Sequence, residues 1–282
     1  MIQLGRFNTM TILRETTPGL YLEAGEDFDG ILLPRRYVTP DMMIDDTVDV
    51  FVYKDSEDRP VATTVIPLVQ VGQFANLQVV HVMDRMGAFL DWGLSKDLLL
   101  PISEQGQQRL QPGDWVIVAV YVDTSDRIVA TTRIDRHFTT EPAHYRPNDP
   151  VDVLIYGESP LGYKAIVNQT HSGLIYRSET SDELNAGDEF IAYVSQSLPD
   201  GKIDLRRDPA GYDRVESVTE TILRHLHDAG GSLAFNDKSP PDAIRATFGT
   251  SKKAFKQALG ALYKQRQIRF TETGIETTTS YL

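Results

Sequence analysis

An internal repeat constrains the fold of this chain more than any other feature of its sequence. The segment DSEDRPVATT at 55–64 returns 68 positions later as DTSDRIVATT at 123–132, with seven of ten residues identical in register. A repeat of this period indicates that the chain is built from copies of one small module. The fold therefore has to be one that fits a unit of this size.

The repeat extends upstream of these two segments and predicts short strands. The matching positions are Gly19, Val48, Val50 and Val52 in the first copy and Gly87, Val116, Val118 and Val120 in the second. Apolar residues at every second position, followed by a Ser- and Asp-rich turn, are typical of half-buried strands joined by hairpins. About five such strands fit in each module, which is the size of a five-stranded Greek-key barrel of the OB type.

A third, weaker copy follows between Val151 and Leu205, where Gly187-Asp188 matches Gly113-Asp114 of the second copy. We therefore expect a mainly β chain that contains three tandem five-stranded OB-type barrels. The predicted domains are 1–66, 67–140 and 146–209, with Pro-rich and charged linkers near 141–150 and 206–213.

The last predicted domain, 213–282, does not repeat and has the pattern of an α+β winged helix. A helix at 218–226 ends at the Gly-rich run 228–231, and Pro240 and Ser251 begin two more helices. In the third helix the expected apolar stripe is Phe255, Leu259, Leu262 and Tyr263, and the opposite face is Lys253, Lys256, Gln257, Gly260 and Lys264. Short strands are expected at 268–270 and 274–276. Three helices with a terminal hairpin describe a helix-turn-helix variant found in nucleic-acid binders.

The distribution of charge supports nucleic-acid binding although the total does not. The formal net charge is −12, whereas phosphate binding depends on Lys and Arg. Residues 210–282, however, carry 10 basic and 8 acidic groups, and 243–271 hold seven Lys or Arg and no acidic residue. The acidic excess therefore belongs to the repeats, and a positive patch is expected in the last domain.

Several other classes of function are disfavoured. The chain has no cysteine, which excludes disulfides and thiolate metal sites and fits a cytoplasmic protein. No apolar run is long enough to span a bilayer, so we expect no membrane partner. The six histidines are scattered, and neither a Walker loop nor a GxSxG elbow occurs. We expect no enzyme, no cofactor and no metal site.

At this point the residues carry a family resemblance. The segments GAFLDWG at 87–93 and GLIYRSE at 173–179 resemble the core motif of the RNA-binding S1 domain, which is an OB module. Together with the VATT hairpins and SKKAFKQALGALYKQRQI at 251–268, the whole chain resembles the bacterial conserved virulence factor B family. The resemblance implies three S1-like domains followed by a winged helix, RNA binding and a role in post-transcriptional regulation.

The resemblance also implies where RNA would bind, because an S1 domain presents an aromatic residue and a histidine that stack on bases. Tyr21 and Phe89 occupy the aromatic slot of the first two copies, with Leu33 and Leu100 in the histidine slot. Tyr176 takes the histidine slot of the third copy. We therefore expect the third barrel to keep an RNA-binding face and the first two to be degenerate as binders.

The hypothesis is that the third barrel and the winged helix form one composite site for single-stranded RNA. Its candidate contacts are Tyr163, Lys164, Tyr176, Arg177, Lys252, Lys253, Lys256, Lys264 and Arg266, and Tyr21 and Phe89 are the further candidate contacts in the first two barrels. The aromatic residues among them would stack on bases, and the basic ones would contact phosphates, with little base-edge specificity.

Other interpretations remain open from the sequence. The aromatic candidates are also explained as ordinary packing residues, and the lysines as the solvated face of an amphipathic helix. Duplex DNA would be bound by placing the helix 251–265 in the major groove, although its exposed face offers no Arg or Asn for bidentate base contacts. A third possibility makes the acidic barrels protein-interaction modules.

Overall fold

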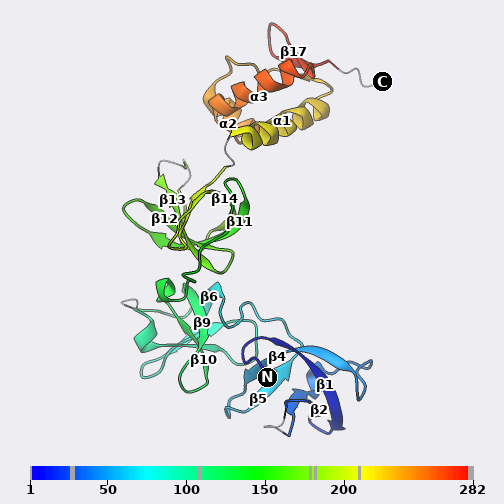
Figure 1. The fold of residues 1–282 in the computed structure, drawn as a ribbon, viewed down its shortest axis with the longest axis vertical. Coiled ribbons are helices and arrows are strands. Elements are labelled where there is room, and N and C mark those ends of the chain that lie inside the picture. Colours follow the sequence, from blue (N-terminus) through cyan, green and yellow to red (C-terminus); the bar gives the residue numbers. More distant parts are fainter. Residues whose placement is uncertain are drawn as a thin grey trace. The chain divides into compact units, whose positions relative to one another are not determined.

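The computed structural model describes residues 2–25, 29–106, 109–177, 180, 183–208 and 211–278, with only the backbone at 211–217. It contains three closed β-barrels followed by a small domain of helices and short strands (Figure 1). The expected fold class is confirmed. The contacts divide the chain into two units, one with the first two barrels and most of the third, the other with the C-terminal domain and short segments of the third barrel. In the described part of the chain, no helix is long and apolar enough to cross a membrane.

The three barrels share one topology. The strand order is β1-β2-β3-β5-β4 in the first barrel, β6-β7-β8-β10-β9 in the second and β11-β12-β13-β15-β14 in the third. The strands of the first are β1 (Phe7–Thr16), β2 (Gly19–Leu22), β3 (Ile31–Pro34), β4 (Thr47–Lys54) and β5 (Pro60–Thr63). Those of the second are β6 (Phe74–Met83), β7 (Gly87–Asp91), β8 (Leu98–Pro101), β9 (Trp115–Val122) and β10 (Ile128–Thr131). Those of the third are β11 (Pro150–Glu158), β12 (Gly162–Val167), β13 (His171–Tyr176), β14 (Glu189–Ser197) and β15 (Ile203–Arg206).

A glycine marks the same point in every barrel, at the start of β2, β7 and β12. A Cβ atom on Gly19, Gly87 or Gly162 would lie 2.0, 2.1 or 2.1 Å from a carbonyl oxygen of the facing strand. A side chain would therefore force these two strands apart. The shared glycine aligns the third, weaker copy with the first two.

A β-bulge also recurs in the long first strand of each barrel. The bulges fall between Ile12 and Arg14, between Val79 and His81, and between Ile155 and Gly157. A bulge sets one residue outside the regular alternation of the strand. In the first two barrels this residue is an exposed aliphatic side chain, Leu13 or Val80. In the third barrel it is Tyr156, which packs against the second barrel.

The first two barrels share one hydrophobic cluster. Phe51 and Tyr53 of β4 pack edge-on against Trp92, which follows β7, with ring centroids 5.7 and 6.5 Å apart. Trp92 is 3% exposed, and its indole Nε1 donates to the carbonyl oxygen of Lys96 at 2.6 Å. Burial of several large rings at this junction stabilises the contact between the two barrels.

The second and third barrels meet through an aromatic series and an acidic residue. The ring of Phe138 lies 5.2 Å from Phe74 and 5.8 Å from Tyr156. The Tyr156 hydroxyl donates to Asp135 at 2.7 Å, and Nζ of Lys164 lies 3.6 Å from the same carboxylate. This junction places Lys164 against the second barrel.

The C-terminal domain has the helices and the hairpin of a winged helix. Its elements are α1 (Gly211–Asp228), β16 (Ser232–Leu233), α2 (Pro241–Phe248), α3 (Lys252–Lys264), β17 (Ile268–Phe270) and β18 (Ile275–Thr277), with sheet order β16-β18-β17. Gly249 ends α2 with φ 63°, and Ser251 caps α3 by accepting from the amide of Ala254 at 3.3 Å. Strand β16 was not predicted as a strand, because two residues are too short for a periodic pattern.

The core of this domain corrects one prediction for α3. Phe255, Leu259 and Leu262 are buried as expected, but Tyr263 is 56% exposed. At about 100° per residue, Tyr263 lies roughly 100° from the centre of the buried face. It therefore belongs to the surface of α3 and not to its apolar stripe.

Candidate nucleic-acid interface

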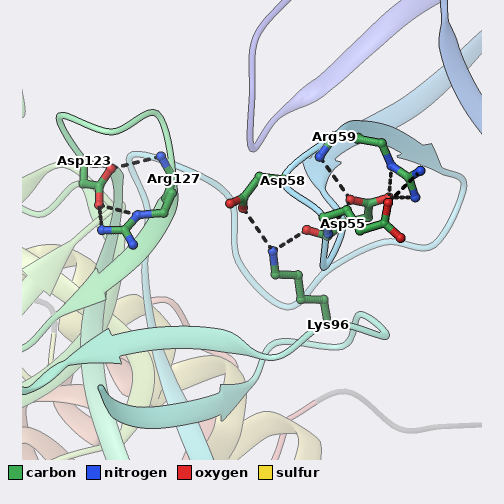
Figure 2. Close-up of polar contacts among 7 residues, drawn as sticks. Asp55, Asp58, Arg59, Lys96, Asp123 and Arg127 are labelled. Carbon is green, nitrogen blue, oxygen red and sulfur yellow. Dashed lines mark hydrogen bonds and ion pairs between the residues drawn. The ribbon is translucent and has the colours of Figure 1, made fainter. Parts of the chain in front are cut away.

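The repeated hairpins that join β4 to β5 and β9 to β10 have the same internal geometry. Asp55 accepts from the amides of Glu57 and Arg59 at 2.9 and 3.0 Å, and its second oxygen accepts from Nε and Nη2 of Arg59 at 2.9 and 2.7 Å (Figure 2). Asp123 accepts from Ser125 and Arg127 in the same way, at 2.8 and 3.0 Å from the amides. One carboxylate thus organises each turn, which explains why this segment is the most similar part of the two copies.

These contacts also change the acidity of the two carboxylates. Burial alone would raise the pKa of Asp55, but hydrogen bonds from the side chain and backbone of Arg59 outweigh it and hold the pKa below its ordinary value of 3.8. The pKa of Asp123 is lowered against the same effect of burial by hydrogen bonds from Arg127. Both carboxylates are therefore ionised near neutral pH, and both turns keep these hydrogen bonds.

The first hairpin also contacts the second barrel. Nζ of Lys96 donates to the carbonyl oxygen of Asp55 at 2.6 Å and lies 3.8 Å from the Asp58 carboxylate (Figure 2). The Tyr53 hydroxyl lies 3.4 Å from Oγ of Ser95 in the same loop. The hairpin that joins β4 to β5 in the first barrel thus packs against the loop at 95–96 of the second barrel.

The aromatic candidates of the first two barrels each carry a neighbour over the ring. The guanidinium of Arg14 lies 4.5 Å from the ring centroid of Tyr21. Phe89 stacks on His81 with centroids 4.4 Å apart and an interplanar angle of 12°. Tyr21 and Phe89 are both half-buried on the sheet surface. A base could therefore stack only on the exposed part of the Arg14–Tyr21 pair or of the His81–Phe89 pair.

The register of the strands corrects the assignment of the histidine slot. Tyr176 lies opposite Gly162, and the residues opposite the equivalent glycines are Pro34 and Pro101. Leu33 and Leu100 lie one position earlier and are completely buried. The slot of the first two barrels therefore holds proline. The error was one residue, which moves a side chain from one face of a strand to the other.

In the third barrel the candidates separate into internal and surface residues. Tyr163 is 4% exposed and lies beneath the guanidinium of Arg177, 5.0 Å from its ring centroid. It therefore cannot stack on a base, which corrects that prediction. Arg177 is exposed and paired with Glu158. Tyr176 is half-buried beside Asp204, whose charge is the main cause that raises the pKa of its phenol.

Lys164 holds the position equivalent to Tyr21 and Phe89, two residues after the shared glycine. Its ammonium group, however, lies 3.6 Å from Asp135 and 5.6 Å from the ring centroid of Tyr156. The side chain is thus used at the junction between barrels. Of the third-barrel candidates, Tyr176 and Arg177 lie at the surface away from this junction, with Arg177 paired with Glu158.

The basic face predicted for α3 is present. Lys253, Lys256, Gln257, Gly260 and Lys264 are all exposed, and so is Arg266, which adopts φ 60° just after the helix. Two of the lysines are anchored near the loop that precedes α2. Nζ of Lys256 lies 3.8 Å from Asp237, and Nζ of the half-buried Lys252 is 3.4 Å from the carbonyl oxygen of Lys238.

An exposed aromatic pair lies beside this basic face and was missed from the sequence. Tyr263 and Phe270 are 56% and 44% exposed, and their ring centroids are 5.3 Å apart. Lys256 and Tyr263 are seven residues apart and therefore share one side of the helix. The helical angle of Tyr263 was a usable signal in the sequence, whereas the contact with Phe270 depends on how the hairpin folds back.

Comparisons with known proteins agree with this architecture. Residues 4–65 and 71–133 match the S1 domain, and residues 220–276 match the CvfB-like winged helix domain. An array of S1 domains that ends in a winged helix defines a nucleic-acid-binding protein, and nucleic-acid binding is the function that these domains support.

The relatives identify the family. The chain is 31% identical to the "Uncharacterized protein YitL" of Bacillus subtilis over 96% of its own length and 92% of the relative's. It is 26% identical to "Conserved virulence factor B" of Staphylococcus epidermidis, over 90% and 88% of the two chains. A crystal structure described as a multidomain protein with nucleic acid binding domains, from Streptococcus pneumoniae, is 27% identical, covers 97% of this chain and 98% of the other, and has a TM-score of 0.44. The chain belongs to the conserved virulence factor B family.

Proposed function

We propose that this protein binds single-stranded RNA through its third barrel and its winged helix, and that it acts without enzymatic activity as a post-transcriptional regulator. The observation that carries the choice of a single strand is the exposed Tyr263–Phe270 pair beside the lysines of α3. Unpaired bases stack on exposed aromatic rings, and nearby cations hold the phosphates. Tyr176 and Arg177 supply the corresponding groups on the third barrel.

Duplex DNA is the less favoured partner on the same surface. The exposed face of α3 presents lysines, a glutamine and a glycine, which contact phosphates but provide few bidentate contacts to base edges. The aromatic pair has no role in reading the major groove of an intact duplex. The same residues that support RNA therefore offer little for sequence-specific duplex recognition.

Photo-crosslinking tests the proposal at the level of domains. Full-length protein is bound to a short RNA that carries 4-thiouridine, irradiated and digested, and the crosslinked peptides are identified by mass spectrometry. We expect crosslinks in the peptides that contain Tyr263, Phe270 and Tyr176. Crosslinks confined to the first two barrels would refute the assignment of the surface, and their complete absence at low salt would refute RNA binding.

A further inference from the structure

The outer surface of the second barrel carries an exposed tryptophan close to its contact with the third barrel. In the register of the sheet, Trp115 of β9 lies opposite Gln78 of β6, and Gln78 lies opposite Asp91 of β7. Residues directly opposite each other in neighbouring strands share one face of the sheet. All three are exposed, and Trp115 is 62% exposed. They therefore form one open row across three strands, which we call the Trp115 row.

The Trp115 row continues a face that already makes a contact between barrels. Further along the same two strands, Phe74 of β6 lies opposite Ala119 of β9. Both are buried in a cluster that includes Leu154 and Ile166 of the third barrel. The face is thus covered by protein at one end and open at the other, where Trp115 lies.

The third barrel shows that this face of the module packs against protein. The β-bulge in the long first strand of each barrel aligns Leu154 with Gln78 and Tyr156 with Val80. Leu154 is 4% exposed, and the Tyr156 ring lies 5.8 Å from Phe138 at the junction with the second barrel. Val80, by contrast, is 47% exposed. The same face is therefore a contact surface in the third barrel and is uncovered in the second.

The charges around the Trp115 row favour a cationic partner. The segments that border the row are 74–80, 87–93, 111–119 and 185–189, and they contain four carboxylates and no Lys or Arg. The last of them borders the row because Gly187 packs on Asn76, where an added Cβ atom would lie 2.6 Å from Nδ2. Acidic groups repel the phosphates of RNA and attract basic side chains. A tryptophan ring is also the best aromatic partner for an Arg or Lys cation. The row therefore suits a basic protein segment better than a nucleic acid.

We propose that the Trp115 row docks a basic segment of a partner protein, with one cationic side chain over the Trp115 indole and a second beside Asp91. The Asp91 carboxylate is held in place by the amide of Gly93, which donates to it at 2.9 Å. Two strand spacings, or about 10 Å, separate the two positions, and an extended chain covers this distance in about three residues. A partner with Arg or Lys three positions apart therefore fits the row. A second copy of this chain fits less well, because a stable dimer buries about 800 Å² on each partner and the row has one large apolar side chain.

Acrylamide quenching of tryptophan fluorescence in the full-length chain tests this proposal. The chain has two tryptophans, and Trp92 is 3% exposed, so the quenching reports mainly on Trp115. The probe is a synthetic peptide with Arg at every third position and Gly and Ser between, added at physiological salt. At saturation it should lower the quenching constant at least about twofold, because a bound side chain covers the indole. The same peptide with Glu in place of Arg should leave the constant unchanged.

Binding of the dye-labelled Arg peptide to variants measures what each side chain contributes. Trp115→Leu and Asp91→Asn should each weaken binding at least about fivefold, with melting temperatures that show both variants to be folded. The repeat supplies a matched control, Glu23→Gln. Glu23 holds the position of Asp91 in the first barrel, where Thr47 stands in place of Trp115. This variant removes one charge of the same sign and should keep wild-type affinity for the peptide.

Several results would overturn the proposal. Unchanged quenching in the presence of the Arg peptide would show that Trp115 stays uncovered. An equal loss of affinity in Glu23→Gln and Asp91→Asn would show a general attraction to the acidic barrels. Protection of Trp115 by single-stranded RNA would assign the row to nucleic acid, and protection by raising the protein concentration alone would assign it to a second copy of the chain. RNA affinity should stay at the wild-type value in Trp115→Leu, so the test does not depend on the function proposed above.

Discussion

At the scale of single residues, one aspartate in each repeated hairpin both accepts backbone amides of the turn and forms an ion pair with an arginine. Asp123 accepts two backbone amides and two nitrogens of Arg127, and its side chain is only 17% exposed. Charged hydrogen bonds are stronger than neutral ones, but the exposure of Arg127 weakens the pair through solvent screening. The turn therefore depends on the charge of a carboxylate as well as on its shape.

This dependence predicts a pH effect on stability. Asp123→Asn keeps an acceptor for the amides but loses the ion pair, so it should lower the unfolding free energy of the barrel by about 1 kcal/mol at pH 7. The pKa of Asp123 in the folded chain is lowered from 3.8. Its contribution is therefore present above that value and disappears as the pH falls through the lower, folded-state pKa. Urea unfolding of both proteins should show a difference that is constant from pH 7 to about 5 and shrinks below 3.8.

The neighbouring aspartate of the same turn is a suitable control. Asp126 adopts φ 55°, which asparagine tolerates as well as aspartate. Asp126→Asn should leave stability unchanged across the same pH range. A difference between wild type and Asp123→Asn that stays constant through the acidic range would contradict the role assigned to its charge.

At the scale of secondary-structure elements, the surface of the winged helix depends on how α3 and β17 pack. Tyr263 belongs to the last turn of α3 and Phe270 to β17, and the two exposed rings meet at 5.3 Å. Neither ring is needed to fill the core, which is formed by Phe255, Leu259 and Leu262. An exposed aromatic pair with no structural requirement points to a ligand.

Removing either ring should weaken RNA binding without unfolding the domain. Tyr263→Ala and Phe270→Ala are each expected to cost about 1–3 kcal/mol of binding free energy for single-stranded RNA. Fluorescence anisotropy at low salt measures the loss, and an unchanged melting temperature confirms that the fold is intact. Trp115→Ala, which removes a ring that is 62% exposed on the second barrel, should leave RNA affinity unchanged. Equal effects of all three substitutions would argue against a specific aromatic site.

Which elements could be predicted from the sequence follows from what each one depends on. The strands before the repeated turn and the helix that begins at Ser251 have local signals, namely alternation and capping, and both were predicted. Side-chain roles that depend on contacts between distant segments were not. Tyr163 is a buried residue and Lys164 an interdomain one, because of packing that no local pattern records. The slot assigned to Leu33 was wrong because a register shift of one residue is invisible without the paired strand.

At the scale of the molecule, the second and third barrels are joined by more than a linker. Phe138 lies between Phe74 of the second barrel and Tyr156 of the third, and the amide of Phe74 donates to the side chain of Gln169 at 2.7 Å. Domains in one chain usually move relative to each other unless their interface is sizeable and apolar. We therefore expect the aromatic series to limit motion at this junction.

Phe138→Ala should loosen the junction while leaving each barrel folded. Hydrogen–deuterium exchange should rise in peptides that cover 134–140 and 168–172, where Thr139 donates its amide to the carbonyl oxygen of Thr170, and stay unchanged in the first barrel. Val82→Ala, an exposed change on the same barrel, serves as the control. Unchanged exchange at the junction would show that the aromatic series does not restrain it.

The most direct test of the central claim is a competition experiment with the full-length chain. A labelled single-stranded RNA is bound at two salt concentrations and displaced by unlabelled RNA or by duplex DNA of equal length. If stacking and phosphate contacts act together, the RNA should displace the probe at a concentration about tenfold or more below that of the duplex at both salts, while both affinities fall as salt rises. Displacement by duplex DNA at equal or lower concentration would contradict binding of single-stranded RNA as the function of this protein.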